Sequence, residues 1–335
     1  MYKRQILASG DKNIDLISVN DEMISEFKHK GYLEPLEKNV MTEEVRDSFP
    51  QKYLESICEE NGHIYSVPFQ MDIMMFWVNQ ELLKQAGLDE IKNTGDFDIL
   101  QKSLKNPDQY AYGDAWENTH VYNSLSQFVN FWGGDYFDWT DPKTKDAARY
   151  MKSMLDEKNT SPAQFVDQYE QMEEKFIRGK YGCVFMYTSA LGTFLDADVY
   201  GKNKIHMAPL PVLHKKKATN IATWQYVLNN ASENKDAAVR FLQYAAGYEG
   251  STEYAKIMKS YPARVDVIEN EDIDLEGIDM IRKYLREYTL NARPLCENSM
   301  GAVSDMGKLF QGYVLGQCEE DSFFEQAQNC INTYY

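Results

Sequence analysis

The feature that most constrains the fold of this chain is the alternation of short β-branched or aromatic runs with longer stretches of helical period. Short apolar runs of this kind are typical of buried strands, and apolar residues recurring every three or four positions are typical of helices. Strands separated by helices predict an α/β architecture with parallel-rich sheets covered on both faces. The predicted strands cover residues 15–20, 63–69, 74–78, 182–187, 205–211 and 224–229.

Capping residues mark where the predicted helices begin and end. Asp141 is an N-cap residue, and Pro142 after it suits the first helical position, so a helix is expected over residues 143–157. A glycine directly after an amphipathic stretch predicts a helix end, since glycine adopts the left-handed conformation there at least cost. The other predicted helices cover residues 80–86, 234–246, 299–316 and 321–334.

Length and charge narrow the possible architectures and partners. At about 100–200 residues per domain, 335 residues predict two domains. Lys and Arg number 35 against 52 Asp and Glu, a net charge of −17, which excludes nucleic acid and anionic membranes as expected partners. Polar stretches at residues 89–98 and 214–220 are predicted domain boundaries. Two boundaries indicate that the chain crosses between lobes more than once, and clefts between lobes are where ligands bind.

Motifs for catalysis, cofactors and metals are missing from the sequence. There is no phosphate-binding glycine loop, no nucleophile elbow and no His-Glu-x-x-His, and the five histidines share no metal-ligand spacing. The five cysteines include no Cys-x-x-Cys pair. An acidic run at residues 269–279 suggests a calcium loop, but Lys283 stands where that loop requires a bidentate glutamate. We therefore expect no catalytic residue, no cofactor and no metal.

Aromatic residues next to planar polar side chains are the remaining chemical signal. Aromatic content is 13%, and such pairs occur around Phe69, Trp116, Tyr187 and Trp224. A sugar packs its C–H faces on rings and pairs its hydroxyls with carboxylate, amide and guanidinium groups. The clusters therefore suggest a carbohydrate site, with packing of the same rings in the core as the open alternative.

The order of several segments resembles one known family, the extracellular solute-binding proteins of ABC transporters, family 1. No single segment is specific for this family, but the order in which the segments occur along nearly the whole chain is specific for it. The matching segments are SGDKNIDLISVND (9–21), KGYLEPL (30–36), NGHIYSVPFQMD (61–72), FWVNQELLKQAGLD (76–89), EKFIRGKYGCVFMYTSA (174–190), SENKDAAVRFLQYAA (232–246) and YPARVDV (261–267).

The resemblance implies a type II periplasmic-binding-protein fold, in which two α/β lobes joined by crossover strands hinge shut on a ligand. The first lobe is expected over residues 1–93 and 221–290, and the second over 94–220 and 291–335. Relative to the family pattern, the sequence starts late. We expect that the export signal and the first strand–helix–strand segment are not part of it.

The resemblance also implies a function and a set of ligand-contacting residues. The expected function is that of an extracytoplasmic, periplasmic or lipid-anchored receptor. It would be a monomer without enzymatic activity that delivers a mono- or oligosaccharide to a membrane permease. A glycoside hydrolase is the alternative, because it also needs aromatics and paired carboxylates. Carried over singly, the expected ligand-binding residues are Asn20, Asp21, Gln70, Met71, Asp72, Trp116, Glu117, Tyr187, Ser189, Trp224 and Arg293.

Overall fold

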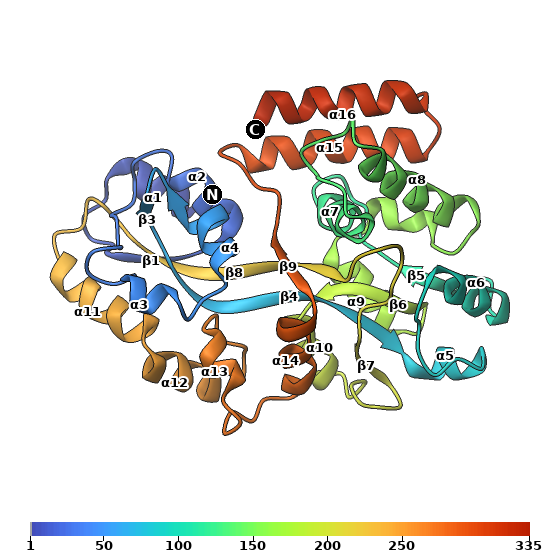
Figure 1. Cartoon of the computed structure of the whole chain (residues 1–335), viewed down its shortest axis with the longest axis horizontal. Coiled ribbons are helices and arrows are strands. Elements are labelled where there is room, and N and C mark those ends of the chain that lie inside the picture. The colour runs from blue at the N-terminus through green and yellow to red at the C-terminus, as the bar shows by residue number, and fades with distance from the viewer. Residues whose placement is uncertain (1) are drawn as a thin grey trace. The chain divides into compact units, whose positions relative to one another are not determined.

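The computed structural model describes residues 2–335 and divides the chain into two compact units (Figure 1). Unit 1 takes the described residues up to Asp72 together with Ile221–Arg282 and Asn291–Ser299. Unit 2 takes Ile73–Asn220, Lys283–Leu290 and Met300–Tyr335. The chain therefore passes between the units several times, as expected for a fold in which each lobe is built from discontinuous segments.

The lobe bounds expected from the sequence and the observed units differ at three places. Residues 283–290, expected in the first lobe, group with unit 2. Residues 73–93 group with unit 2, because the strand that begins at Val67 continues to Asn79 and pairs there with other unit 2 strands. Residues 291–299 group with unit 1, where Arg293 pairs with Asp21. The expected first lobe starts at Met1, which lies outside the described residues.

Unit 1 is built around an antiparallel pair formed by β1 (Leu16–Asn20) and β8 (Ala218–Leu228). The register runs from Leu16 opposite Leu228 to Asn20 opposite Trp224. Apolar side chains such as Val19 and Val227 are fully buried beneath the covering helices. The helices assigned wholly or partly to this unit are α1 (Tyr2–Ser9), α2 (Asp21–Phe27), α3 (Glu43–Arg46), α4 (Gln51–Tyr53), a π-helical turn (Leu54–Cys58), α11 (Lys235–Ala246), α12 (Tyr248–Met258), α13 (Val265–Glu269) and α14 (Ile278–Glu287).

Unit 2 contains the second half of β4 (Val67–Asn79), which pairs antiparallel with β6 (Tyr181–Tyr187) and β7 (Ile205–Ala208). On its other side β6 pairs in parallel with β5 (Tyr110–Gly113). Helices α7 (Val121–Trp132) and α8 (Pro142–Asp156) pack together in this unit (Figure 1). The other helices are α5 (Gln80–Gln85), α6 (Thr94–Ser103), a 3₁₀ turn (Pro162–Val166), α9 (Tyr169–Ile177), α10 (Ala190–Asp196), α15 (Ser299–Val314) and α16 (Glu320–Tyr334).

The expectation of parallel-rich sheets is wrong for the pairings described within the units. β1–β8, β4–β6 and β4–β7 are antiparallel, and β5–β6 is parallel, so the sheet is mixed. The reason is that the long strands β4 and β8, which serve both units, run against their neighbours. Short hairpins β2 (Glu59–Glu60) with β3 (His63–Ile64), and the strand β9 (Thr289–Ala292) beside β8, complete the sheets.

The predicted helix signals correspond closely to observed helix ends. The Asp141 side chain accepts a hydrogen bond from the Lys143 N–H at 2.9 Å and begins α8 with Pro142 in its first turn. After α5, Gly87 has a φ of +71°, the left-handed conformation expected of a residue that ends a helix. The described residues include no helix that is long and apolar enough to cross a membrane.

One pair of glycine substitutions tests the packing of unit 2. A Cβ atom on Gly113 would lie 2.1 Å from the buried Tyr181 ring, so Gly113→Ala forces the ring out of its packed position. We expect the free energy of unfolding to fall by about 1–3 kcal/mol. Gly192 in α10 has no atom within 4 Å of the corresponding position. Gly192→Ala should therefore raise the free energy of unfolding by roughly 0.5–1 kcal/mol. Urea denaturation of both variants checks this, and equal shifts would contradict it.

Candidate functional site

The first candidate site lies in unit 1, where β1 ends and α2 begins. Asn20 is the N-cap of α2, and its side-chain oxygen accepts a hydrogen bond from the Met23 N–H at 3.2 Å. Asp21 and Glu22 follow in the first helical turn, where the helix dipole stabilises negative charge. A strand end followed by a capped helix therefore places two carboxylates at one edge of the unit.

Arg293 binds both of these carboxylates. Its guanidinium contacts both oxygens of Asp21, with Nε donating to Oδ2 at 3.1 Å, and one terminal nitrogen lies 2.6 Å from Glu22 Oε1. Asp21 is fully buried and Arg293 is 9% exposed. We call Asp21, Glu22 and Arg293 the acidic–arginine cluster; it carries two carboxylates for one guanidinium.

Burial sets the protonation behaviour of the cluster. Loss of solvent raises the pKa of Asp21 to about 7, because the ionised carboxylate is poorly stabilised away from water. The positive charge of Arg293 acts in the opposite direction, and the negative charge of Glu22 raises the pKa further. Asp21 is thus a carboxyl group that takes up a proton near neutral pH.

The predicted strands over residues 63–69 and 74–78 left Gln70, Met71 and Asp72 between strands, and this is wrong. All three residues lie within β4. The Met71 N–H donates a hydrogen bond to the Tyr261 carbonyl at 3.0 Å, and Gln70 forms an antiparallel β-bridge with Pro262. This pairing keeps the backbone extended past Pro68. Met71 is buried, whereas Gln70 accepts a hydrogen bond from the Tyr254 hydroxyl at 2.8 Å. Strand alternation therefore places the Met71 side chain on one face of β4 and those of Gln70 and Asp72 on the other.

Trp224 lies in β8 directly across from Asn20 and is 37% exposed. The Lys3 ammonium lies 5.4 Å from the centroid of the ring, a distance at which cation–π attraction acts. Its sequence neighbours Thr223 and Gln225 do not lie beside the ring. Successive strand residues point to opposite faces, so both side chains are buried.

The buried side chains below Trp224 form a polar network that the sequence analysis missed. Tyr53 accepts hydrogen bonds from the Thr223 hydroxyl at 2.7 Å and from the Gln225 amide at 3.0 Å. The Gln225 oxygen in turn accepts hydrogen bonds from Ser66 and, at 3.2 Å, from the Cys58 thiol. Polar residues inside a strand of otherwise apolar and β-branched residues were the available signal. The network holds β8 in place behind Trp224.

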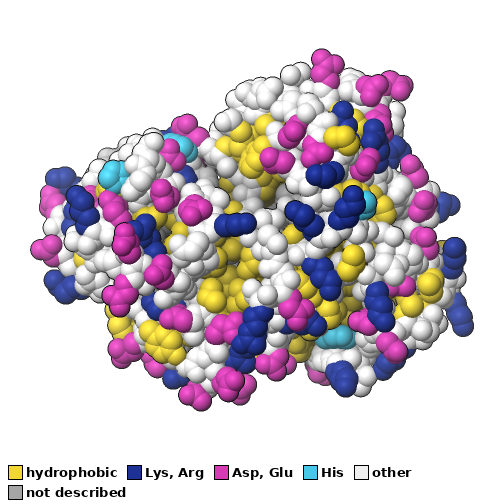
Figure 2. Space-filling model, viewed as in Figure 1, with side chains coloured by type: hydrophobic (Ala, Val, Ile, Leu, Met, Phe, Trp, Pro, Cys, Tyr) yellow, Lys and Arg dark blue, Asp and Glu magenta, His cyan; other side chains and the backbone are white. Residues whose placement is uncertain are grey.

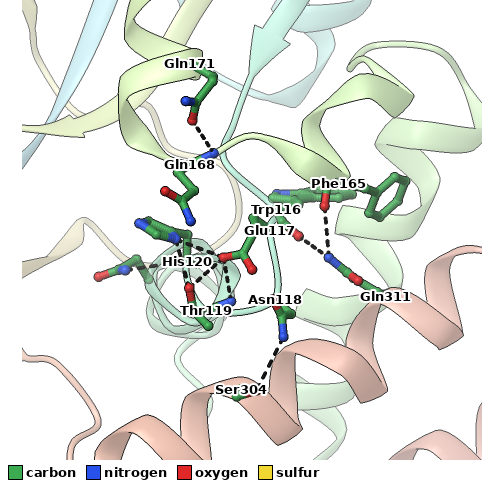
Figure 3. Close-up of polar contacts among 11 residues, drawn as sticks. Trp116, Glu117, Asn118, Thr119, His120, Phe165, Gln168, Gln171, Ser304 and Gln311 are labelled. Carbon is green, nitrogen blue, oxygen red and sulfur yellow. Dashed lines mark hydrogen bonds and ion pairs between the residues drawn. The ribbon is translucent and has the colours of Figure 1, made fainter.

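The second candidate site lies in unit 2 around Glu117 (Figure 3). The Glu117 carboxylate accepts hydrogen bonds from the backbone N–H of Thr119 at 2.9 Å and from its hydroxyl at 2.6 Å, and it lies 3.0 Å from His120 Nδ1. Burial acts to raise the pKa of Glu117, but these hydrogen bonds outweigh it and lower the pKa. We call Glu117, Thr119 and His120 the Glu117 cluster.

Aromatic rings connect the Glu117 cluster to Tyr187. The His120 ring meets Tyr169 edge-on at 5.5 Å, and Tyr169 meets Tyr187 at 6.0 Å. Tyr187, the last residue of β6, donates a hydrogen bond to Asn123 at 3.0 Å. Ser189 follows at the start of α10. The structure thus brings Glu117 and Tyr187 into one region through His120, Tyr169 and Asn123, none of which the sequence analysis had selected.

The Trp116 ring points away from this region and into the core of unit 2. It is fully buried, packs edge-on against Phe165 and Phe310 at 5.6 and 5.4 Å, and donates a hydrogen bond from Nε1 to Asp114 at 2.9 Å. Its carbonyl accepts a hydrogen bond from Gln311 of α15 at 2.6 Å (Figure 3). Of the two interpretations left open for the aromatic rings, sugar contact or core packing, core packing describes the environment of Trp116.

Helix α15 positions the loop that carries Glu117. Asn118 donates a hydrogen bond to Ser304 at 3.3 Å, and a Cβ atom on Gly307 would lie 1.9 Å from the Asn118 carbonyl oxygen (Figure 3). Only a residue without a side chain allows the helix and the loop to approach so closely. In the described part of the chain, no group of three or more His, Cys, Asp or Glu residues could hold a metal ion. Each candidate site places hydrogen-bonding side chains in the same unit as an aromatic ring.

Comparison with known proteins defines the class of this chain. The fold is that of the periplasmic binding proteins: the structure matches a solute-binding protein of Thermotoga lettingae bound to α-D-tagatose. The TM-score is 0.83 at 18% identity, over 99% of this chain and 88% of that one. The family model for bacterial extracellular solute-binding proteins matches residues 2–252, and the chain belongs to this family. Family and fold are those of transport binding proteins, and membership implies an extracytoplasmic location.

Two curated relatives differ in the ligands that their names state. An arabinooligosaccharide-binding protein of Bacillus subtilis is 22% identical over 282 residues, covering 80% of this chain. A protein of Sinorhizobium fredii named "Probable amino-acid ABC transporter periplasmic-binding protein" is 24% identical over 239 residues, covering 68% of this chain. The matched regions span 64% and 54% of these relatives.

The raised pKa of Asp21 predicts a pH dependence of stability. An unfolded aspartate titrates near 3.9, roughly three units below the value of about 7 in the folded chain. The folded state therefore holds the proton more tightly, and this contribution to stability is lost as pH rises through 7. Asp21→Asn should remove this pH-dependent contribution. The difference in melting temperature, wild type minus variant, should therefore become smaller as the pH is raised from 5.5 to 8. A constant difference would contradict the prediction.

Proposed function

We propose that this chain is the receptor of an ABC importer for a neutral mono- or oligosaccharide or a polyol, and that it passes its ligand to membrane permease subunits. The observation that carries the proposal is that each unit of this solute-binding fold holds carboxylates close to the position of an aromatic ring. In unit 1, Asn20, which directly precedes the acidic–arginine cluster, lies across from Trp224. In unit 2, the Glu117 cluster lies beside Tyr169, which contacts Tyr187.

The chemistry of both clusters favours a neutral, hydroxyl-rich ligand. Carboxylates accept hydrogen bonds from hydroxyl groups, and aromatic faces pack against the C–H faces of a sugar ring. An anionic ligand would meet the excess carboxylate of the acidic–arginine cluster. The ligands named for the tagatose-bound structure and the arabinooligosaccharide relative agree with this chemistry.

The proposed receptor works outside the cytoplasm, as a periplasmic or lipid-anchored monomer whose lobes hinge shut on the ligand. Closure of two lobes around a ligand is a known mode of domain motion. Small-angle X-ray scattering of the chain with and without a bound sugar tests it. We expect a smaller radius of gyration with sugar, and an unchanged one would contradict hinge closure while leaving binding itself intact.

A thermal-shift screen tests the ligand class. The panel contains monosaccharides, oligosaccharides, polyols and amino acids, because a ligand that binds only the folded state raises the melting temperature. We expect a shift with at least one sugar or polyol and none with amino acids. Shifts restricted to amino acids would overturn the carbohydrate assignment, and turnover of a glycoside would favour the hydrolase alternative.

Two tryptophan substitutions separate ligand contact from packing. Trp224→Ala removes an exposed ring, so we expect the affinity for the sugar found in the screen to fall by about 2–4 kcal/mol. Trp116→Ala removes a core ring and should lower the free energy of unfolding by about 3–5 kcal/mol without a selective loss of affinity. Calorimetric titration and thermal melts measure both. Ile99→Ala, at an exposed position of α6, is the control, and unchanged affinity in Trp224→Ala would remove that ring from the site.

A further inference from the structure

Unit 1 contains a pocket of about 290 Å³ that belongs to neither candidate site. It lies among β4, β8, α11 and α12, and its walls are mainly aromatic. The rings and the one charged group that line it are Phe69, Tyr226, Phe241, Tyr244, Tyr254 and Glu253. A volume of this size approaches that of sites for small organic ligands.

The aromatic walls form one connected array. Phe69 stacks on Tyr226 with ring centroids 4.1 Å apart. Tyr254 meets Phe69 edge-on at 5.4 Å, and Phe241 meets Tyr226 edge-on at 5.4 Å. Because each ring contacts the next, the walls keep their shape when the pocket is open to solvent.

The helix corner that closes the pocket is also tightly fixed. A Cβ atom on Gly250 would lie 2.0 Å from the Tyr244 carbonyl oxygen, so the start of α12 packs directly on the end of α11. The Ser251 hydroxyl donates to the Ala245 carbonyl at 3.3 Å, and Tyr254 is held by its hydrogen bond to Gln70. The pocket is therefore preformed.

Large apolar side chains around the mouth are exposed to solvent. Ile257 is 73% exposed, Met258 61%, Tyr244 50% and Phe241 46%. Figure 2 shows hydrophobic side chains gathered at the lower left, where Figure 1 places α12. Contiguous apolar surface of this kind marks a binding site rather than ordinary surface, since exposing it to water is unfavourable.

The charge at the pocket selects among apolar ligands. Glu253 lines the pocket. Its carboxylate lies 3.7 Å from the Lys256 ammonium, and both side chains are about half exposed, so this ion pair is loose. Glu249 lies one helical turn before Glu253 on α12. In a chain of net charge −17, these carboxylates repel anions and attract cations.

We propose that this pocket binds a small aromatic amine, with the ring among Phe69, Tyr226, Phe241 and Tyr254 and the ammonium group beside the Glu253 carboxylate. Aromatic faces attract both rings and cations, and the carboxylate adds a charge-assisted hydrogen bond. None of the residues that line this pocket is among the expected ligand-binding residues of the carbohydrate site. The proposal is therefore independent of the proposed carbohydrate site.

Three indole probes with the same ring and different charges test the proposal. Calorimetric titration of the full chain compares tryptamine, which is cationic, indole, which is neutral, and indole-3-acetate, which is anionic. We expect tryptamine to bind most tightly and indole-3-acetate most weakly. Equal binding of tryptamine and indole-3-acetate, or no binding of any probe, would overturn the proposal.

Two variants assign the binding to this pocket. Glu253→Gln should weaken tryptamine roughly two- to fivefold and leave indole unchanged, because it removes only the charge. Phe241→Ala should weaken all three probes about tenfold, with Tyr244→Leu as a second wall variant if the first melts early. Ile99→Ala in unit 2 is the control. If the Glu253 and Phe241 variants bind every probe as tightly as Ile99→Ala does, the probes bind elsewhere and the proposal is refuted.

Discussion

The continuity of β4 is the constraint on which the organisation of this chain depends. A strand satisfies its backbone groups only through its neighbours, so each part of β4 must pair where it lies. Its early residues engage Tyr261 and Pro262 in unit 1, and its later residues pair with β6 and β7 in unit 2. One uninterrupted strand thus belongs to both units, and the residues before and after Asp72 cannot shift register independently.

The two candidate sites hold their carboxylates in physically different ways. Asp21 is fully buried against a guanidinium, so desolvation dominates and its pKa rises. Glu117 lies at a partly open surface and accepts several hydrogen bonds, so its pKa falls. A partly exposed carboxylate can exchange its hydrogen bonds for new ones with little rearrangement of the protein. Removing one partner of a buried ion pair, in contrast, leaves an uncompensated charge. The acidic–arginine cluster therefore contributes rigidity to unit 1.

Much of the fold could be predicted because its signals are local. Asp141 with Pro142 marks the start of α8, Gly87 marks the end of α5, and the order of segments indicates the family. What could not be predicted depends on distant partners. The predicted strand ended at Phe69, but pairing with residues 261–263 keeps β4 extended beyond it. The burial of Trp116 depends on Phe165 and Phe310, and the role of His120 depends on Tyr169, none of which is recognisable from nearby sequence.

The exposure of Trp224 has a spectroscopic consequence. Of the five tryptophans, Trp77, Trp116, Trp132 and Trp139 are buried, and Trp224 alone is more than one-third exposed. Its indole lies next to water and the Lys3 ammonium, so it emits at longer wavelength than the four buried rings and is the one that iodide reaches. The red edge of the intrinsic fluorescence therefore reports on a single position in β8. The chain carries its own optical probe at the proposed sugar site, and no dye is needed.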